Sequence, residues 1–256
     1  STPVTGSGTV TPPATPAFVA PPPATVAASG LVPPTGAYLA ILHDISFSGR
    51  PFLNVSRRAP GVKLPSGRVL GTHELKGYLD HLRKQGYVGF VEIQIRSRSG
   101  SGGEYYFLTG AGHMAIGSLH KPGRGGTDFG HDYVQRFIEH LFRAKGVTAT
   151  LEARLPTSSS PVDLGIIPCP HTGFKVAVQC CLSTFATEPS QAAKNLREGW
   201  GRVIVCCLTS TDLKKLVREF KKAGVVDPRI AGVVVADIKN ATSLGDIIDN
   251  PGYFVG

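Results

Sequence analysis

The chain has 256 residues, of which 27 are Lys or Arg and 18 are Asp or Glu, so its formal net charge is +9. Hydrophobic residues make up 41% of the chain, which excludes a protein that is disordered throughout. The longest apolar run, residues 203–208, falls far short of the roughly 20 residues of a membrane span, and no secretory signal opens the sequence. We therefore expect no membrane partner and a cytoplasmic location.

The sequence has five cysteines, an odd number, and four of them form two adjacent pairs inside apolar runs. This pattern does not fit a secreted disulfide framework, and no pair of cysteines has zinc-ligand spacing. We expect all five thiols to be small buried hydrophobic groups in a reducing compartment. They are Cys169, Cys180, Cys181, Cys206 and Cys207.

Residues 1–36 contain nine of the 20 prolines and no charged residue. Such a segment cannot form a helix or a sheet, so we predict an extended linker or tail, with a ligand for a proline-recognition domain as the alternative. A linker implies a further domain or a partner protein upstream.

Positive charge is concentrated in the first half of the remaining chain. The net charge is +7 over residues 37–146 and +2 over residues 147–256. This asymmetry indicates a polyanionic partner, most simply DNA.

Three helices and a hairpin are predicted next, in chain order. The helices are expected over 38–49, 52–58 and 72–85, the last with Thr72 as N-cap and Gly86 after its end. Strands are expected over 88–96 and 104–108, joined by a Gly/Ser-rich turn with a basic tip.

This order resembles the winged helix-turn-helix family over roughly residues 37–118, and we place the corresponding domain at residues 37–130. In that family the third helix enters the major groove and the wing contacts the DNA backbone or minor groove. The resemblance therefore implies that the helix 72–85, the wing and a following basic loop bind DNA, although winged helices also serve as protein-interaction modules. The implied DNA-binding residues are Lys76, Arg83, Lys84, Arg96, Arg98, Lys121 and Arg124.

The second half predicts a mixed sheet flanked by helices. The apolar periodicity gives a helix at 132–145, strands at 147–153, 162–167 and 175–182, a helix at 190–198, a strand at 202–208, a helix at 212–223 and a strand at 230–238. The whole chain is thus α+β or α/β, with a winged-helix domain followed by an αβββαβ domain over residues 131–256.

The αβββαβ order, with Asp163 in the second strand and Gln179 in the third, resembles the PD-(D/E)xK nuclease-like (restriction-endonuclease-like) superfamily. Active members bind Mg²⁺ through the Asp and the Glu or Gln position and use a nearby Lys. Here Cys181 stands at the lysine position, so Lys194 in the next helix is the candidate substitute. Further candidates are the acids Glu139 and Glu152, and Lys175, which lies about 13 Å from Gln179 along an ideal strand.

The intact Asp163 without a second carboxylate on the third strand favours a degenerate, non-catalytic domain that needs no cofactor. We expect a DNA-binding module, of the kind that resembles DNA-processing or DNA-transfer machinery. The alternatives are a Mg²⁺-dependent endonuclease that uses Asp163, Gln179 and Lys194, and a protein-interaction module. The histidines, among them His113, His120 and His131, are expected at the surface.

Overall fold

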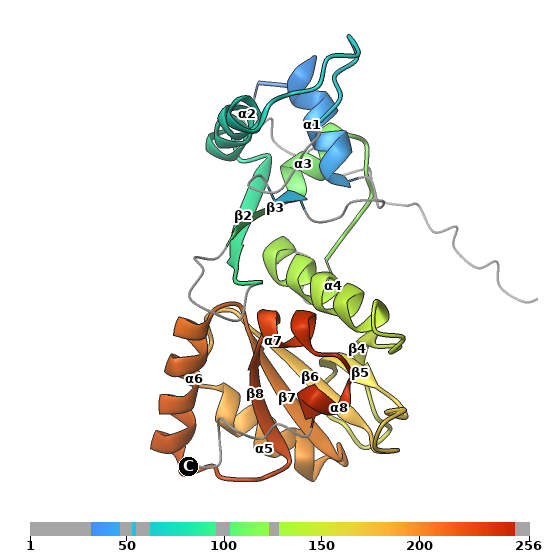
Figure 1. The fold of residues 1–256 in the computed structure, drawn as a ribbon, viewed down its shortest axis with the longest axis vertical. Helices are drawn as coiled ribbons and strands as arrows, with labels where there is room; N and C mark the ends of the chain where they lie inside the picture. The colour runs from blue at the N-terminus through green and yellow to red at the C-terminus, as the bar shows by residue number, and fades with distance from the viewer. Residues whose placement is uncertain (1–31, 47–52, 55–61, 96–102, 123–127, 249–256) are drawn as a thin grey trace, which may run out of the picture. The chain divides into compact units, whose positions relative to one another are not determined.

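The computed structural model describes residues 32–46, 53–54, 62–95, 103–122 and 128–248. Contacts divide the chain into Ser1–Val32 and a compact unit from Pro33 to Gly256. All that follows concerns the described residues of the second unit (Figure 1).

The first part of this unit is a small antiparallel sheet with helices around it. Its elements are α1 (Ala37–Ser46), β1 (Leu53–Asn54), α2 (Thr72–Lys84), β2 (Val88–Ile93), β3 (Gly103–Leu108) and α3 (Gly110–Ala115), and the strand order is β1-β3-β2. Leucines on one side of α2, at positions 75, 79 and 82, are fully buried, as their helical spacing predicts. The predicted first helix, third helix and hairpin strands are therefore present.

Two details of the prediction for this part are wrong. Leu53 and Asn54 do not belong to a helix over 52–58, because they pair as a strand with Tyr106 and Tyr105. An available sheet edge satisfies backbone groups that a short, weak helix leaves open, so the tertiary pairing prevails over local propensity. In addition, the N-cap of α2 is Gly71, and Thr72, the predicted N-cap, is the first residue of the helix.

The second part is built on a five-stranded mixed sheet, as the sequence predicts. Its strand order is β4-β5-β6-β7-β8, antiparallel across β4, β5 and β6 and parallel across β6, β7 and β8. The strands are β4 (Thr150–Ala153), β5 (Val162–Ile166), β6 (Val176–Cys181), β7 (Arg202–Cys207) and β8 (Ile230–Val234), and the helices are α4 (Phe129–Arg143), α5 (Glu188–Arg197), α6 (Ser210–Ala223), α7 (Val235–Asn240) and α8 (Gly245–Ile248).

Helices cover both faces of this sheet. Helices α4 and α7 contact each other, and their apolar residues belong to one hydrophobic cluster with Leu164, Val178 and Cys180. Helices α5 and α6 also contact each other and pack over the other cluster, which contains Ala177 and Cys181. Alternate residues of the buried strand β6 thus face different helix layers, and this places Gln179 on the side of Cys181.

The last strand is shorter than predicted. Residues 235–238 belong to α7 and not to a strand that runs to Ile238, because the Asp237 carboxylate accepts a hydrogen bond from the Val234 backbone N–H, 3.0 Å away, and begins a helical turn.

The first and second parts share one hydrophobic core. Ile93 and Tyr105 of the hairpin belong to the same cluster as Val134 of α4. The hairpin also continues toward the large sheet, where the backbone N–H of Gln94 donates to the carbonyl of Leu208 at 3.0 Å. The domain boundary at residues 130/131 stays a prediction from the sequence. Both the shared hydrophobic cluster and the hydrogen bond from Gln94 to Leu208 cross this boundary.

All five cysteines are buried, as predicted for small hydrophobic side chains, and their thiols are free of disulfide bonds. Among the helices in the described ranges, none combines the length and the hydrophobicity that crossing a membrane requires.

Candidate functional site

Three polar residues form a row of neighbouring register positions across β4, β5 and β6. Glu152 is opposite Asp163, between the paired residues Leu151↔Leu164 and Ala153↔Val162. Gln179 is opposite Asp163 on the other side, one position beyond the pair Leu164↔Val178. The antiparallel register therefore brings together residues that are far apart in the sequence, including both candidates that the nuclease resemblance singled out.

The Asp163 carboxylate is buried and occupied by protein donors. Its Oδ2 accepts a hydrogen bond from the backbone N–H of Cys180 at 2.7 Å, and its Oδ1 accepts one from Nε2 of Gln135 at 3.1 Å. The His131 Nε2 lies 3.6 Å from Oδ2. Both carboxylate oxygens thus have protein partners, which compensate for the loss of water around a buried charge.

Gln135 on α4 joins the two carboxylates of the row. Its Nε2 donates to Glu152 Oε1 at 2.7 Å as well as to Asp163 Oδ1, and the residue is only 2% exposed. An amide nitrogen carries two hydrogens, so one group can donate to both acids. Because the amide oxygen cannot face two carboxylates, the orientation of this side chain follows from its neighbours. The neutral amide therefore lies between the two acids. A cation in that position would reduce the repulsion between the carboxylates, but the amide already fills it.

The backbone of Glu152 is adapted to this contact. Its φ of 49° makes it the one residue other than glycine with positive φ in the described chain. This conformation costs an L-residue about 1–2 kcal/mol. The strain is tolerated where the side chain bonds to Gln135, which indicates that the cluster constrains the local backbone.

The lysine position of the nuclease-like pattern is an inert thiol. Cys181 is fully buried and pairs in register with Cys207 of the parallel neighbour β7. A side-chain hydrogen bond with Cys207, followed by burial, raises the pKa of the Cys181 thiol far above its ordinary value. This side chain therefore supplies neither a positive charge nor a thiolate.

The other predicted catalytic residues lie outside this row. Lys194 reaches Ser160 Oγ at 3.1 Å and lies 3.9 Å from Glu198, so its ammonium is near the site but is held by these two oxygens. Lys175 is exposed just before β6, and Glu139 pairs with Arg143 on another side of α4. The structure thus brings Asp163, Gln179 and Glu152 together and leaves the predicted lysines and Glu139 apart from them.

A polar pocket of about 390 Å³ opens beside the row. Gln179, 6% exposed, lines it, and its Oε1 has no hydrogen-bond partner among the described residues. Glu188, at the first position of α5, also lines it and accepts a hydrogen bond from Thr184 Oγ1 at 3.1 Å. Glu188 was not among the predicted site residues because the helix was expected to begin at residue 190, although an acid in the first turn of a helix is a recognised signal. The other lining residues are Asp128, His131, Ser160, Pro161, Asp163, Cys180, Leu182, Ser183, Thr184, Thr187 and Gln191.

These residues do not fit the divalent cation that the nuclease resemblance implies. Both oxygens of Asp163 already accept hydrogen bonds, and the Gln135 amide stands between Asp163 and Glu152. Across the part of the chain that the structure describes, no three His, Cys, Asp or Glu side chains gather in a way that would hold a metal ion.

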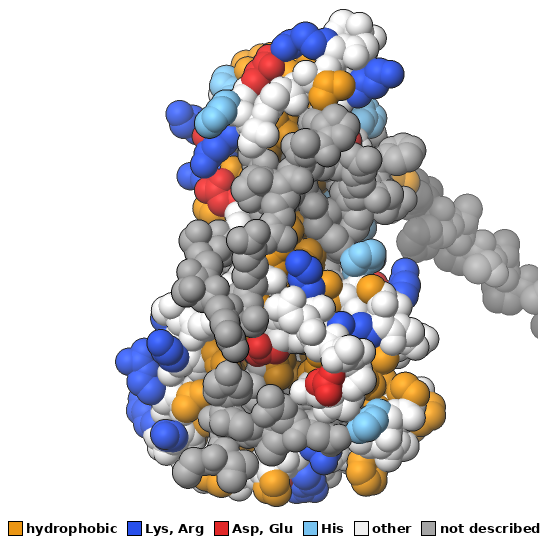
Figure 2. Space-filling view, in the orientation of Figure 1, with side chains coloured by type: hydrophobic (Ala, Val, Ile, Leu, Met, Phe, Trp, Pro, Cys, Tyr) orange, Lys and Arg blue, Asp and Glu red, His pale blue; other side chains and the backbone are white. Residues whose placement is uncertain are grey.

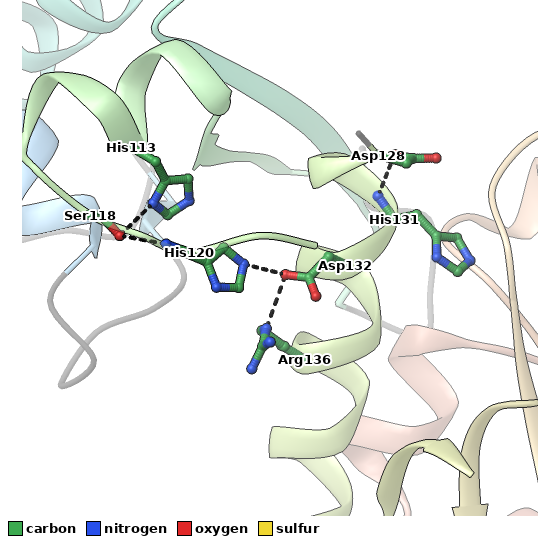
Figure 3. A network of polar contacts seen from close by, with 7 residues as sticks. All are labelled: His113, Ser118, His120, Asp128, His131, Asp132 and Arg136. Carbon is green, nitrogen blue, oxygen red and sulfur yellow. Dashed lines mark hydrogen bonds and ion pairs between the residues drawn. The ribbon is translucent and has the colours of Figure 1, made fainter. Parts of the chain in front are cut away.

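A second polar network lies on the adjacent side of α4 (Figure 3). The buried Asp132 carboxylate accepts hydrogen bonds from His120 Nε2 at 2.9 Å and from Arg136 Nε at 3.0 Å. The His131 ring points away from this network (Figure 3), toward Asp163. The prediction of surface histidines is wrong for His113, His120 and His131, which are partly buried because they serve as partners of buried acids or of each other.

His113 is the most strongly perturbed histidine of this network. Its Nδ1 lies 3.1 Å from Ser118 Oγ, and its ring centroid is 4.8 Å from that of His120. Burial, and to a smaller extent the nearby His120, lower the pKa of His113 to about 4, while Asp132 opposes the shift. His113 is therefore neutral at pH 7.

The predicted DNA-binding residues that the structure describes are exposed. On α2, Lys76 Nζ lies 3.5 Å from Glu104, and the Arg83 guanidinium stacks 4.6 Å from the ring centroid of Phe90. Lys84, on the same helix, and Lys121 are exposed and make no ion pair with another described residue. The remaining three predicted residues, Arg96, Arg98 and Arg124, lie outside the described residues.

Comparison with protein-family models, with curated proteins and with solved structures gives no match to this chain. The function is therefore argued from its residues alone.

Proposed function

We propose that this chain binds nucleic acid through its basic first part, and that its second part is a nuclease-like domain that serves as a scaffold without hydrolytic activity. DNA is the partner that the charge asymmetry and the helix–hairpin order favour.

The observation that carries the proposal is the outer face of α2. Its buried leucines fix the helix against the small sheet, so that Lys76, Arg83 and Lys84 remain exposed on the other side. The planar Arg83 is held over Phe90, which reduces the entropy lost when it contacts a phosphate. Exposed cations on one helix are what a phosphate backbone requires.

The scaffold role is supported by the polar row. The amide of Gln135 bridges the two carboxylates, and Cys181 replaces the lysine that would stabilise developing charge. One amide donor shared by the buried Asp163 and the partly buried Glu152 leaves no need for a metal between the two acids.

The test is an electrophoretic mobility shift of the full chain on double- and single-stranded DNA, over a salt series, with EDTA and with Mg²⁺. We expect intact, shifted DNA in both metal conditions and an affinity that falls steeply with salt. Absence of any shift at low salt would overturn the proposal and favour a protein-interaction module.

The contribution of α2 is tested with the double variant Lys76→Gln/Lys84→Gln. Two lost phosphate contacts should reduce the slope of log Kobs against log [salt] by about 1.8. The matched control is Arg154→Gln/Lys239→Gln, which removes two exposed positive charges outside α2. Equal effects of the two double variants would show that net charge alone is responsible.

One observation favours a second candidate function, a metal-dependent endonuclease. The Oε1 of Gln179 lacks a partner among the described residues and lines the same pocket as Asp163 and Glu188. Cleavage that needs Mg²⁺ or Mn²⁺ and disappears in Asp163→Asn would establish this candidate in place of the scaffold role. Lys194→Gln would then test whether this lysine serves as the substitute.

A further inference from the structure

The positive charge of the second part is concentrated on one helix. Residues 147–256 contain 12 Lys and Arg, and five of them lie on α6 within nine residues. Figure 2 shows Lys and Arg side chains gathered over α6, at a place separate from those over α2. The five are Lys214, Lys215, Arg218, Lys221 and Lys222.

Three of these cations form an unpaired stripe, which we call the α6 stripe: Lys214, Arg218 and Lys221. Their spacing of i, i+4 and i+7 puts them on one face of the helix, and all three are exposed. None of the three makes a hydrogen bond or an ion pair with another described residue. By contrast, Lys215 pairs with Asp212 at 2.9 Å and Lys222 lies 3.8 Å from Glu219.

On α4 and α5, three cations pair with acids four residues away. Arg136 pairs with Asp132 and Arg143 with Glu139 on α4. On α5, Lys194 lies 3.9 Å from Glu198. The α6 stripe departs from this arrangement, and its Lys214–Arg218 neighbours repel each other by a few tenths of a kcal/mol at helical spacing.

The requirements of the helix explain only part of this charge. Cations in the last turn, such as Lys221 and Lys222, interact favourably with the negative end of the helix dipole. Lys214 and Arg218 lie earlier in the helix, where that interaction has decayed. The opposite side of α6 is already fixed by Leu213, Leu216 and Phe220, which are buried against the sheet.

We propose that the α6 stripe is a second contact surface for the phosphate backbone of nucleic acid, an inference that rests on the proposed function. From Lys214 to Lys221 the helix rises about 10 Å. One nucleic-acid strand places roughly three phosphates along that length of a duplex. The stripe therefore presents about one cation for each phosphate. It contacts the backbone without reading base sequence, because it carries only Lys and Arg side chains on a convex helix.

The test compares the double variant Lys214→Gln/Lys221→Gln with the control Arg154→Gln/Lys239→Gln in DNA binding over a salt series. Both remove two exposed positive charges; Lys239 is on α7, which packs with α4 over the other hydrophobic cluster, and Arg154 follows the edge strand β4. We expect the stripe variant to reduce the salt slope by about 1.8 and the control to leave it near the wild-type value. Far-UV circular dichroism and the urea midpoint of the stripe variant are expected to be unchanged, since the side chains of Lys214 and Lys221 make no hydrogen bond or ion pair with another described residue.

The outcomes separate this inference from the proposed function. A wild-type slope in the stripe variant, together with a reduced slope in Lys76→Gln/Lys84→Gln, would overturn the stripe and leave the proposed function intact. No DNA binding by the wild-type chain would overturn both. If the stripe variant lost binding to phosphatidylserine vesicles but bound DNA as the wild type does, the stripe would be assigned to an anionic membrane surface. That result would overturn the inference as well.

Discussion

Helix α4 carries two polar faces that differ in their burial. On the face that meets the large sheet, Gln135 is 2% exposed, and its amide donates hydrogen bonds to Glu152 and Asp163. On the neighbouring face, Asp132 is buried, but its partner Arg136 has a side chain that is 47% exposed. The polar network of the first face is enclosed by protein, whereas the network of the second face reaches solvent through Arg136.

This difference in solvent access indicates which polar contacts contribute most to the free energy of unfolding. Where water cannot reach, removal of one partner leaves the others with an uncompensated desolvation penalty. Where one partner is exposed, solvent replaces most of what is lost. The substitutions that follow test this contrast in order of decreasing effect, together with one test of Mg²⁺ binding and one of pH dependence.

The largest effect is expected from Gln135→Ala. The buried Asp163 and the partly buried Glu152 would lose their common donor, so the free energy of unfolding should fall by about 3 kcal/mol. The measurement is urea unfolding, with the midpoint read at an unchanged m-value. Gln191→Ala is the control, because its Nε2 donates to the neutral Asn195 Oδ1, and should cost about 1 kcal/mol or less.

The effect of Mg²⁺ on the urea midpoint tests whether the buried network can hold a cation. Millimolar Mg²⁺ should leave the wild-type midpoint unchanged, because the amide of Gln135 stands between Glu152 and Asp163. A wild-type midpoint that rises with Mg²⁺ would contradict this view, since only a ligand that binds the folded state stabilises it.

Asp132→Ala should have the next largest effect. It removes the acceptor of His120 Nε2 and Arg136 Nε, and we expect a loss of about 1.5 kcal/mol in unfolding free energy. Glu139→Ala, which breaks the more exposed pair with Arg143, should cost about 0.5 kcal/mol. Equal losses in the two variants would show that burial does not separate the two pairs.

A pH-dependent effect is expected from His113. Its pKa is lowered from 6.5 to about 4 in the folded state, first by burial and then by His120. The unfolded chain therefore binds a proton more readily, and this contribution to stability is present above about pH 6.5 and is lost as the pH falls toward 4. The urea midpoint should fall more between pH 7 and pH 5 in the wild type than in His113→Gln, and identical falls would refute the assignment.

The smallest effect is expected from Arg136→Ala. Its half-exposed side chain contributes about 0.5 kcal/mol through the pair with Asp132, and 0.5 M NaCl should reduce even that difference. A loss as large as that of Asp132→Ala would mean that Arg136, and not His120, is the main partner of the acid.

Several features were predictable because the physics behind them is local. The spacing of Leu75, Leu79 and Leu82 determines a helix with one buried side, and the adjacent cysteines in apolar runs are buried as expected. Leu53 and Asn54 were not predictable in this way, since their strand exists only because β3 offers them an edge. Likewise, Glu188 becomes a pocket residue only when β6 and α5 are assembled.

The charge asymmetry, the order of helices and strands in the second part, and the presence of an aspartate in its second strand and a glutamine in its third follow from the sequence. These depend on residue type and on periods of two or 3.6 residues. The position of Gln135 between Glu152 and Asp163, and the pairing of Cys181 with Cys207 in strand register, depend on the tertiary structure. Hydrogen-bond partners of a buried acid are set by strand register and helix packing, which join residues that no local pattern connects.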